Sequence, residues 1–455
     1  MRASAGSSEK PSVQRSPFRV AVVGLWHLGC VAAGCLARLG HVVAGIEDDP
    51  QNLAALRAGR APLREPGLDE LLAGEIGAGR LRFTQEFDDT VAGADVVCVA
   101  YDTPVTDRDE ADMSIVTRTI ERIAPILRAD ALLLVQSQVP VGTCRKVRAM
   151  VRTGSAGDAP EVAYVPENIR LGQAIEGYLR PDMVVMGADD PRAHVLVERL
   201  FAGIDAPHIR TDLSTAEMTK HAINTFLATS ISFANELANL CQIEGIDAPA
   251  LVSILRRDRR VGSQVPLNPG MGFAGGTLAR DVKALAAVGY AGGYAPRLLD
   301  AVLQVNESQK SLPIQWLRQI YGTLEGVRVA VFGLTYKPGT STLRRSDALP
   351  LIRQLIADGV AVTAVDPQAE PAEVEDLPRV EFTRDAYGAV QGTDAFIVMT
   401  PWPEFTTLDY ERVRAAMRHP VVLDMPNALN RERLTELGFA YIGVGRGAVR
   451  RLARY

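Results

Sequence analysis

Short runs of apolar, mostly β-branched residues occur in the same order in both halves of the chain. The first run, at 19–25, has the sequence Arg-Val-Ala-Val-Val-Gly-Leu, and 328–334 has the sequence Arg-Val-Ala-Val-Phe-Gly-Leu. A continuous apolar run that ends in glycine is typical of a parallel strand buried on both faces. The two segments therefore predict the first strands of two similar units.

Three further pairs of apolar runs occur in the same order in the two halves: 40–47 with 359–366, 93–100 with 392–399, and 131–135 with 421–424. Helical patterns lie between the strands, as at 28–39 and 346–358. Because four strand signatures recur in one order, they predict an α/β fold with two doubly wound, Rossmann-like domains.

Residues 206–305, between the two strand-rich regions, have a different pattern. Within them, 214–244 has helical periodicity and contains neither glycine nor proline, which predicts a helix about 45 Å long at 1.5 Å per residue. A central helical domain that joins two α/β domains would leave a cleft between them, the usual place of a ligand. The expected divisions are a disordered tail and three domains: 1–17, 18–205, 206–312 and 313–455.

The composition excludes several classes of protein. Hydrophobic residues make up 47% of the chain and charged residues 23%, as in ordinary globular proteins. The net charge of −5 lacks the basic surplus of a nucleic-acid-binding protein, so no nucleic-acid partner is expected. No apolar run approaches the ~18 residues of a membrane span, and 1–16 lack the apolar core of a secretory signal. Five cysteines without a Cys-x-x-Cys spacing predict a cytoplasmic location, with no disulfide framework and no metal site.

A glycine-containing turn comes directly after the first predicted strand. Its sequence, Gly24-Leu-Trp-His-Leu28-Gly29, matches the dinucleotide-binding fingerprint except at Trp26, where a glycine would let the backbone approach the pyrophosphate. Glu47 ends the second predicted strand, 23 residues after Gly24, where a carboxylate binds a ribose diol and disfavours a 2′-phosphate. The segment thus predicts NAD in preference to NADP. The alternative is a βαβ unit that binds nothing, because Trp26 could block the phosphates.

Three polar residues of the predicted central helix share one face. Glu217, Lys220 and Asn224 are spaced by three and four residues. A lysine and an amide on one face can hold a developing oxyanion. The spacing alone, however, favours a solvated Glu217–Lys220 pair.

Two further segments have the composition of ligand-binding loops. Residues 268–281 contain four glycines around Phe273 and lead into a predicted helix, which lets backbone N–H groups surround a ligand. In the second α/β region, Lys337 and Arg344 come after the strand at 328–334 and suit a diphosphate. The alternatives are a flexible connector and a solvated basic surface.

These motifs together resemble the UDP-glucose/GDP-mannose dehydrogenase family from about residue 18 to 450. The matching stretches are Glu65-Pro-Gly-Leu68, Val139-Pro-Val-Gly-Thr143, Pro166-Glu167, Lys220 with Asn224, Pro269-Gly-Met-Gly-Phe273, Arg280-Asp281, Tyr336-Lys-Pro-Gly-Thr340, Arg344, Asp366-Pro367 and Gly443-Val-Gly-Arg-Gly447. The resemblance implies an N-terminal NAD domain, a helical dimerisation core and a C-terminal domain that binds the nucleotide of a sugar substrate. It also implies a homodimer and a role in polysaccharide biosynthesis.

The resemblance is interrupted at the reacting centre. Family members oxidise a sugar C6 hydroxymethyl group twice, and the second step needs a loop cysteine that forms a thioester. Thr277 stands at that position, and none of the five cysteines falls in the loop. Further departures from the family are Asp102, Gln138, Leu171, Arg280, Ser341, Thr342 and Pro426. This pattern favours altered chemistry.

The resemblance implies three groups of site residues. The catalytic group is Glu167, Lys220, Asn224, Thr277 and Asp281; the cofactor group is Gly24, Trp26, Leu28, Gly29, Glu47, Thr103 and Gln138; the substrate group is Phe273, Gly275, Lys337 and Arg344. In the catalytic group, Lys220 and Asn224 would polarise the sugar oxygen. Asp281 would position a water or the lysine, and Glu167 would carry a proton.

We expect an NAD-dependent oxidoreductase that acts on a nucleotide sugar and performs a single two-electron oxidation without the cysteine step. One alternative is a redox-neutral isomerase or epimerase that uses tightly held NAD. The other is a non-catalytic nucleotide-sugar-binding protein, for which Trp26 and Thr277 are the motivation.

Overall fold

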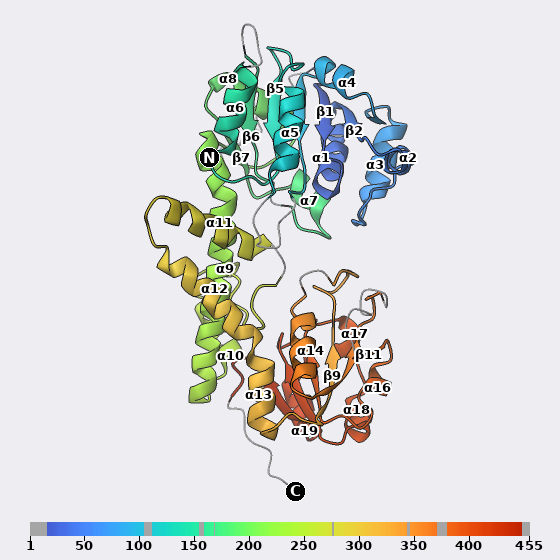
Figure 1. Cartoon of the computed structure of the whole chain (residues 1–455), viewed down its shortest axis with the longest axis vertical. Coiled ribbons are helices and arrows are strands. Elements are labelled where there is room, and N and C mark those ends of the chain that lie inside the picture. The colour runs from blue at the N-terminus through green and yellow to red at the C-terminus, as the bar shows by residue number, and fades with distance from the viewer. Residues whose placement is uncertain are drawn as a thin grey trace, which may run out of the picture. The chain divides into compact units, whose positions relative to one another are not determined.

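The computed structural model describes residues 16–103, 112–153, 159–167, 169–274, 277–343, 346–370 and 380–447. The chain divides into two units, Met1–Lys220 and His221–Tyr455. Each unit contains one sheet, and the long helix α9 (Leu213–Glu244) crosses the division (Figure 1). Most of the expected tail, up to residue 15, lies outside the described residues, and the three expected domain ranges stay predictions.

The sheet of the first unit has the strand order β3-β2-β1-β4-β5-β6-β7-β8. The strands are β1 (Arg19–Val23), β2 (Val42–Ile46), β3 (Leu81–Thr84), β4 (Val96–Val99), β5 (Leu132–Val135), β6 (Glu161–Tyr164), β7 (Val184–Ala188) and β8 (His208–Thr211). The first six pair in parallel, and β7 joins antiparallel to β6. The strand order reverses between β1 and β4, the switch point at which doubly wound sheets bind ligands.

Helices cover both faces of this sheet. They are α1 (His27–Arg38), α2 (Pro50–Arg57), α3 (Leu68–Gly77), α4 (Phe87–Gly93), α5 (Ser114–Ile123), α6 (Thr143–Thr153), α7 (Ala174–Leu179) and α8 (Pro191–Leu200). Alternate residues of β1 face opposite sides: Val20 and Val22 pack with α1, whereas Ala21 and Val23 pack with α5. The strand is therefore apolar at every position because each of its faces is covered.

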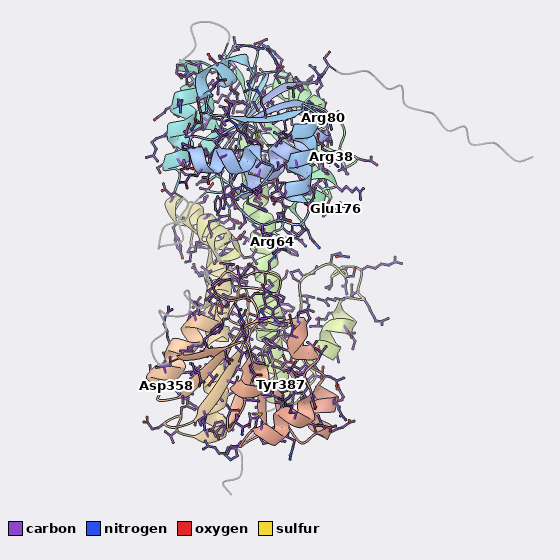
Figure 2. The ribbon with its side chains drawn as sticks, turned by 90° about the vertical axis from the view of Figure 1, so that its right-hand side faces the viewer. Arg38, Arg64, Arg80, Glu176, Asp358 and Tyr387 are labelled. Atoms are coloured by element: carbon purple, nitrogen blue, oxygen red, sulfur yellow. The ribbon has the colours of Figure 1, made fainter. Side chains whose placement is uncertain are left out.

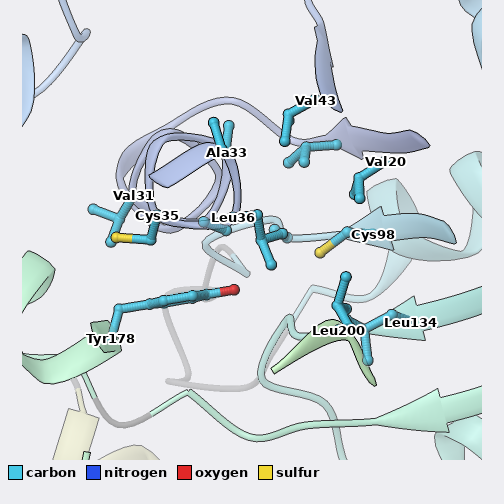
Figure 3. Packing of buried hydrophobic residues seen from close by; sticks show 14 of the residues in the cluster. Val20, Val31, Ala33, Cys35, Leu36, Val43, Cys98, Leu134, Tyr178 and Leu200 are labelled. Atoms are coloured by element: carbon cyan, nitrogen blue, oxygen red, sulfur yellow. The ribbon is translucent and has the colours of Figure 1, made fainter. Parts of the chain in front are cut away.

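Helix α1 is buried from its first residue, His27, to Ala37, because α3 and α7 pack on the side that the sheet leaves open. Figure 3 shows Leu36 of this helix beside Cys98 of β4, with Tyr178 of α7 below it. The packing on all sides positions the N-terminus of α1 at the switch point.

One buried carboxylate fastens α3 to its neighbours. Glu75 is almost fully buried, and its oxygens accept hydrogen bonds from Arg38 of α1 at 2.8 Å and from Arg80 at 2.7 Å. The two arginines lie near one another on the same face of the unit (Figure 2). Two cations with hydrogen-bond contact offset the cost of burying this charge.

The sheet of the second unit repeats the order of the first. Its strands, all parallel, are arranged β11-β10-β9-β12-β13-β14. They are β9 (Arg328–Phe332), β10 (Ala361–Val365), β11 (Val380–Thr383), β12 (Ala395–Val398), β13 (Val421–Asp424) and β14 (Ala440–Gly443). The four predicted pairs of strands are thereby confirmed as β1 with β9, β2 with β10, β4 with β12 and β5 with β13, and each sheet is doubly wound.

The second unit adds a helical segment before its sheet. Its helices are α10 (Ala248–Leu255), α11 (Thr277–Ala291), α12 (Arg297–Lys310), α13 (Leu312–Tyr321), α14 (Ala348–Ala357), α16 (Ala386–Ala389), α17 (Pro403–Thr406), α18 (Tyr410–Ala416) and α19 (Arg431–Glu436). The long helix predicted at 214–244 is confirmed as α9. Within the described residues, no helix is both long and apolar enough to cross a membrane.

Glycine is required at the turn that ends the first strand of each sheet. Gly24 has φ +94°, and a Cβ atom there would lie 2.8 Å from the ring of Tyr101. Gly333 has φ +90°, and a Cβ atom there would lie 2.5 Å from Thr400. Gly29 packs so closely on the turn that an added Cβ would overlap the carbonyl oxygen of Gly24. Gly24 thus makes the turn that ends β1, and Gly29 permits the close packing of α1 on this turn.

Replacing Gly29 with alanine is expected to lower the free energy of unfolding by about 2 kcal/mol or more, because the methyl group meets backbone that cannot move aside. Gly74 is the matched control: it is exposed within α3 and has open space around it. Gly74→Ala is expected to gain about 0.5–1 kcal/mol. Urea unfolding followed by circular dichroism measures the stability of both variants. Equal unfolding midpoints would contradict the close packing of Gly29 on the turn at Gly24.

Candidate functional site

The turn after β1 places the N-terminus of α1 at the switch point of the first sheet. The N–H of Trp26 donates to the carbonyl oxygen of Gly24 at 3.0 Å, and the indole of Trp26 is 50% exposed. The N–H of Leu28, in the first turn of the helix, donates to Oδ2 of Asp102 at 3.0 Å. Asp102 lies on the segment after β4, the strand next to β1. A carboxylate therefore sits at the helix end where anions bind.

The acid at the end of the second strand is placed differently in the two units. Glu47, after β2, is half-buried, and its Oε1 accepts from the N–H of Asp49 at 2.9 Å. Partial burial raises its pKa. Asp366, after β10, is fully buried and accepts from the N–H groups of Leu334 and Thr335 at 2.7 and 2.9 Å. Glu47 faces the surface of its domain, whereas Asp366 is used to fold the turn.

Two loops of the first sheet are joined beside this turn. The hydroxyl of Thr103, after β4, donates to the carbonyl oxygen of Gln138, after β5, at 2.8 Å. Both residues are buried. The N–H of Tyr101 also donates to Oγ of Ser137 at 2.7 Å. These bonds hold the carboxyl ends of β4 and β5 together and place Thr103 beside the backbone of Gln138.

Glu167 and Lys220 meet in the first unit. Nζ of Lys220 lies 3.6 Å from Oε1 of Glu167, and both side chains are largely buried. The second oxygen of Glu167 accepts from the N–H of Ile169 at 2.9 Å, which fixes the carboxylate. Sequence spacing could not find this pair because the two residues are 53 positions apart and lie on different elements.

Glu217 does not form the solvated pair with Lys220 that the helical spacing favoured. Its carboxylate is fully buried and accepts from the N–H groups of Gly142 and Cys144 at 2.5 and 2.6 Å. These donors belong to the first turn of α6 and the residue before it, so Glu217 caps that helix. The solvated interpretation was wrong because neighbouring backbone, absent from any local pattern, takes both carboxylate oxygens.

A second cluster, in the second unit, is centred on Asp281 of α11. Oδ1 of Asp281 lies 2.9 Å from Nδ1 of His221, and the amide nitrogen of Asn224 donates to Oδ2. Nε of Arg280 is 3.7 Å from the same carboxylate. Burial acts to raise the pKa of Asp281, but hydrogen bonds from His221 and Asn224 and the charge of Arg280 outweigh it, so the pKa lies below its ordinary value. The carboxylate thus stays charged and anchors α11 to α9.

His221 was missed by sequence reasoning. It lies three residues before Asn224, so a helical projection would have placed both near the same face. The side chain is buried and holds Asp281 from the opposite oxygen. The sequence did show a histidine next to Lys220 on the predicted helix. Spacing alone, however, does not show which residue this histidine contacts.

The glycine-rich loop is held by three amide side chains. Asn235 of α9 accepts from the N–H of Gly270 at 2.8 Å, and Gln309 of α12 donates to the carbonyl oxygen of Gly270 at 2.6 Å. Asn306 of α12 bonds both backbone groups of Phe273, at 2.8 and 3.1 Å. The ring of Phe273 packs in a buried cluster with Val282 and Val302. The helices therefore hold the described part of the loop at Gly270 and Phe273, which a flexible connector would not require.

The remaining predicted residues lie at the surface or outside the described chain. Thr277 is exposed and begins α11, four residues before Asp281. Lys337 is half-buried on the segment after β9. Gly275 and Arg344 lie outside the described residues.

All five cysteines are free and buried: Cys30, Cys35, Cys98, Cys144 and Cys241. Burial raises the pKa of the Cys35 and Cys98 thiols to about 12. Burial and the nearby charge of Glu217 raise the pKa of Cys144 well above its ordinary range. Because the thiolate is the reactive form, these three thiols are poor nucleophiles at neutral pH. Among the described residues, no group of three or more His, Cys, Asp or Glu side chains is placed to hold a metal ion.

Family models cover nearly the whole chain. The NAD binding domain of the UDP-glucose/GDP-mannose dehydrogenase family matches residues 18–205, its central domain matches 214–308, and its UDP binding domain matches 330–431. The chain belongs to this family. Its members are NAD-dependent dehydrogenases that act on the CH–OH groups of nucleotide sugars.

Individual relatives match over the same length. UDP-glucose 6-dehydrogenase of Pseudomonas aeruginosa is 35% identical over 94% of this chain and 98% of the relative. UDP-glucose 6-dehydrogenase TuaD of Bacillus subtilis is 33% identical over 95% and 94%. The structure of a UDP-glucose dehydrogenase from Pyrobaculum islandicum superimposes with a TM-score of 0.86 at 32% identity, covering 96% of this chain and 100% of that one.

Family membership makes NAD the cofactor, and the first unit carries features that fit it. The turn at Gly24 has the required conformation, Gly29 permits the close packing of α1, and the half-buried Glu47 lies beyond β2. Trp26 and Asp102 are the two residues at the helix end that depart from the pattern. The nucleotide-sugar domain of the family corresponds to the second sheet.

Replacing Glu47 with alanine is expected to weaken NAD binding by about 1–3 kcal/mol, because a charge-assisted hydrogen bond to the ribose is lost. The same change removes the repulsion that a 2′-phosphate would meet, so binding of NADP should weaken less or improve. Calorimetric titration of both proteins with both dinucleotides measures the difference. If the unmodified protein bound NADP as tightly as NAD, Glu47 could not have this role.

Proposed function

We propose that this protein oxidises the C6 hydroxymethyl group of a nucleotide sugar, a UDP-hexose by analogy with its relatives, and stops after one two-electron step. The observation that carries the proposal is the chemistry of the loop. Thr277 begins α11, and all five cysteines are buried elsewhere. The product is then the aldehyde, or its hydrate, and one NADH.

The first unit supplies a cation and a proton acceptor side by side. Nζ of Lys220, 3.6 Å from Oε1 of Glu167, binds the sugar oxygen as negative charge develops on it. Glu167 takes the hydroxyl proton. NAD supplies the acceptor for the hydride that leaves the same carbon. Loss of one hydride and one proton converts the alcohol into an aldehyde and balances the step.

The second unit supplies fixed polar groups. Asn224 is oriented by its bond to Asp281, and His221 holds that carboxylate from the other oxygen. A charged, fully hydrogen-bonded Asp281 is a positioning residue: it keeps the amide of Asn224 in one orientation, ready to bind the sugar oxygen. In the same unit, the hydrogen bonds at Gly270 and Phe273 hold these two residues of the glycine-rich loop in place.

Conversion of an aldehyde into an acid needs an adduct that can expel hydride. A cysteine forms such an adduct because a fraction of it is thiolate near neutral pH. A threonine hydroxyl titrates far above that range and is a weak nucleophile. The second oxidation is therefore slow at Thr277.

The nucleotide of the substrate is bound by the C-terminal domain, for which we propose the limits 313–455. The proposed limits of the other domains are 18–205 and 206–312. Lys337, after β9, provides a cation for the diphosphate, and Arg344 comes seven residues later in the chain.

With UDP-glucose as the probe, we expect about one NADH per sugar at completion and a product that a hydrazine reagent traps as an aldehyde adduct. Absorbance at 340 nm counts the NADH, and mass spectrometry identifies the adduct. Two NADH per sugar with a uronic acid product would overturn the single-step proposal. Sugar conversion without net NADH would favour the redox-neutral isomerase.

Two substitutions at the loop separate thiol chemistry from loop shape. Thr277→Cys introduces a nucleophile at the start of α11 and should raise the yield of acid, while Thr277→Ser keeps a hydroxyl and should not. An acid yield that does not differ between the two variants would mean that the residue at this position does not control the second oxidation.

The chain also forms a two-fold dimer, we propose, through the exposed face of α9. Phe226, Phe233 and Leu240 lie seven residues apart on this helix and are 58%, 53% and 57% exposed. Side chains at this spacing share one face of a helix. A row of large apolar side chains left in water is unusual for a monomer, and pairing with a second copy would bury it.

Phe233→Asp is expected to shift the protein from dimer to monomer at micromolar concentration, because it places a charge at the centre of the row. Val195→Asp is the matched control, since Val195 is an exposed apolar residue on α8 of the first unit. Sedimentation velocity compares the three proteins. A monomeric unmodified protein would contradict the proposed dimer.

A further inference from the structure

The side chain of Asp102 contacts the N-terminus of α1, the first helix of the first unit. Its Oδ2 accepts from the N–H of Leu28 at 3.0 Å, in the first turn of the twelve-residue helix α1. The first N–H groups of a helix have no partner within the helix, and the helix dipole favours negative charge there. In a dinucleotide-binding fold this is where the pyrophosphate lies. The carboxylate of Asp102 therefore accepts from a backbone N–H group at the place where the pyrophosphate of the cofactor would bind.

The second unit shows that the fold itself does not require this acid. Tyr101 and Asp102 come after β4, and by the repeat of the two sheets Thr400 and Pro401 come after β12. Tyr101 and Thr400 play the same part, since each closes over the glycine of its turn. Pro401, at the place of Asp102, carries no charge. The turn can therefore form without a carboxylate at this position, and the first sheet has one where the second sheet has none.

Asp102 is open to solvent on one side but is partly desolvated by the protein around it, which raises its pKa. Charged groups also face it from the surrounding elements. His27, the first residue of α1, favours the charge of Asp102, whereas the carboxylate of Glu167, paired with Lys220, opposes it. His27 itself lies 2.9 Å from Glu65, which also accepts from the N–H groups of Gly172 and Ala174.

We propose that the carboxylate of Asp102 is a resident anion at the N-terminus of α1 and that NAD binds by displacing it from Leu28. The proposal rests on NAD binding by the first unit. Two negative groups compete for one helix end, so the charge of Asp102 lowers the affinity for any ligand with a pyrophosphate. Protonation of Asp102 removes the competition.

This competition fixes the sign of the pH dependence. A bound pyrophosphate disfavours the charged form of Asp102, so binding raises the pKa of this group and takes up protons. Affinity for NAD therefore increases as pH falls toward the pKa of Asp102. Each unit by which binding raises that pKa corresponds to a tenfold change in affinity. Glu47 acts in the opposite direction, because its protonation weakens the bond to the ribose, so the pH dependence must be compared between variants.

D102N is the decisive variant because an amide oxygen still accepts from Leu28 while the charge is gone. Calorimetric titration at pH 8 is made with NAD, with ADP and with adenosine, which lacks phosphate. We expect D102N to bind NAD and ADP about tenfold more tightly than the unmodified protein and adenosine equally well. As pH falls from 8 toward the range in which Asp102 titrates, NAD affinity should rise more for the unmodified protein than for D102N.

Two controls keep the comparison specific. D190N removes an acid of the same kind at the N-terminus of α8 in the same unit, where Asp190 accepts from Arg192, and should leave NAD affinity unchanged. D102S is a second variant that removes the charge of Asp102, and it should bind NAD more tightly, as D102N does. Thermal unfolding of each protein verifies that it is folded.

The outcomes separate this proposal from the proposed function. NAD affinity in D102N and D102S that equals that of the unmodified protein, or is weaker in both, would overturn the role of Asp102 while leaving the dehydrogenase intact. An equal gain for adenosine would also overturn it, because the pyrophosphate would then not be the group that Asp102 opposes. Absence of NAD binding in every variant would overturn both proposals together.

Discussion

The close approach of Gly29 to the carbonyl oxygen of Gly24 is the constraint on which the first unit depends. Without a side chain at either position, β1 turns directly into α1, and the buried helix is held with its N-terminus at the switch point of the sheet. Tyr101 closes over the turn from the neighbouring strand. This packing sets the position of the helix end, and with it the place where Leu28 and Asp102 meet.

The acid that follows the second strand of each sheet has different partners in the two units. In the second unit, the acid at the end of β10 folds inward: Asp366 accepts from Leu334, Thr335 and further backbone donors, so the turn is satisfied by the protein itself. In the first unit, Glu47 is half-buried at the end of β2 and accepts from the N–H of Asp49. Repetition of a fold therefore does not repeat its site, because a one-carbon difference in side chain and a change of neighbours redirect the carboxylate.

The buried carboxylates of Glu217 and Asp281 are each stabilised by their own hydrogen-bond donors. Glu217 takes two backbone N–H groups of the α6 turn, and Asp281 takes an imidazole and an amide. These bonds tie together elements that are far apart in the sequence. Both acids lie within the region 214–308 that matches the central domain of the family.

The sequence by itself determined the two doubly wound sheets, the long helix, the family and the cofactor, because buried parallel strands and glycine turns leave local patterns. It did not determine the partners of polar residues. Glu217 looked like half of a surface pair until α6 was placed against it, and His221 carried no signal until Asp281 lay opposite. Periodicity records which face of an element is buried, but a hydrogen bond joins atoms brought together from distant positions. The occupant of the α1 terminus, Asp102, was decided in this way by the pairing of β1 with β4.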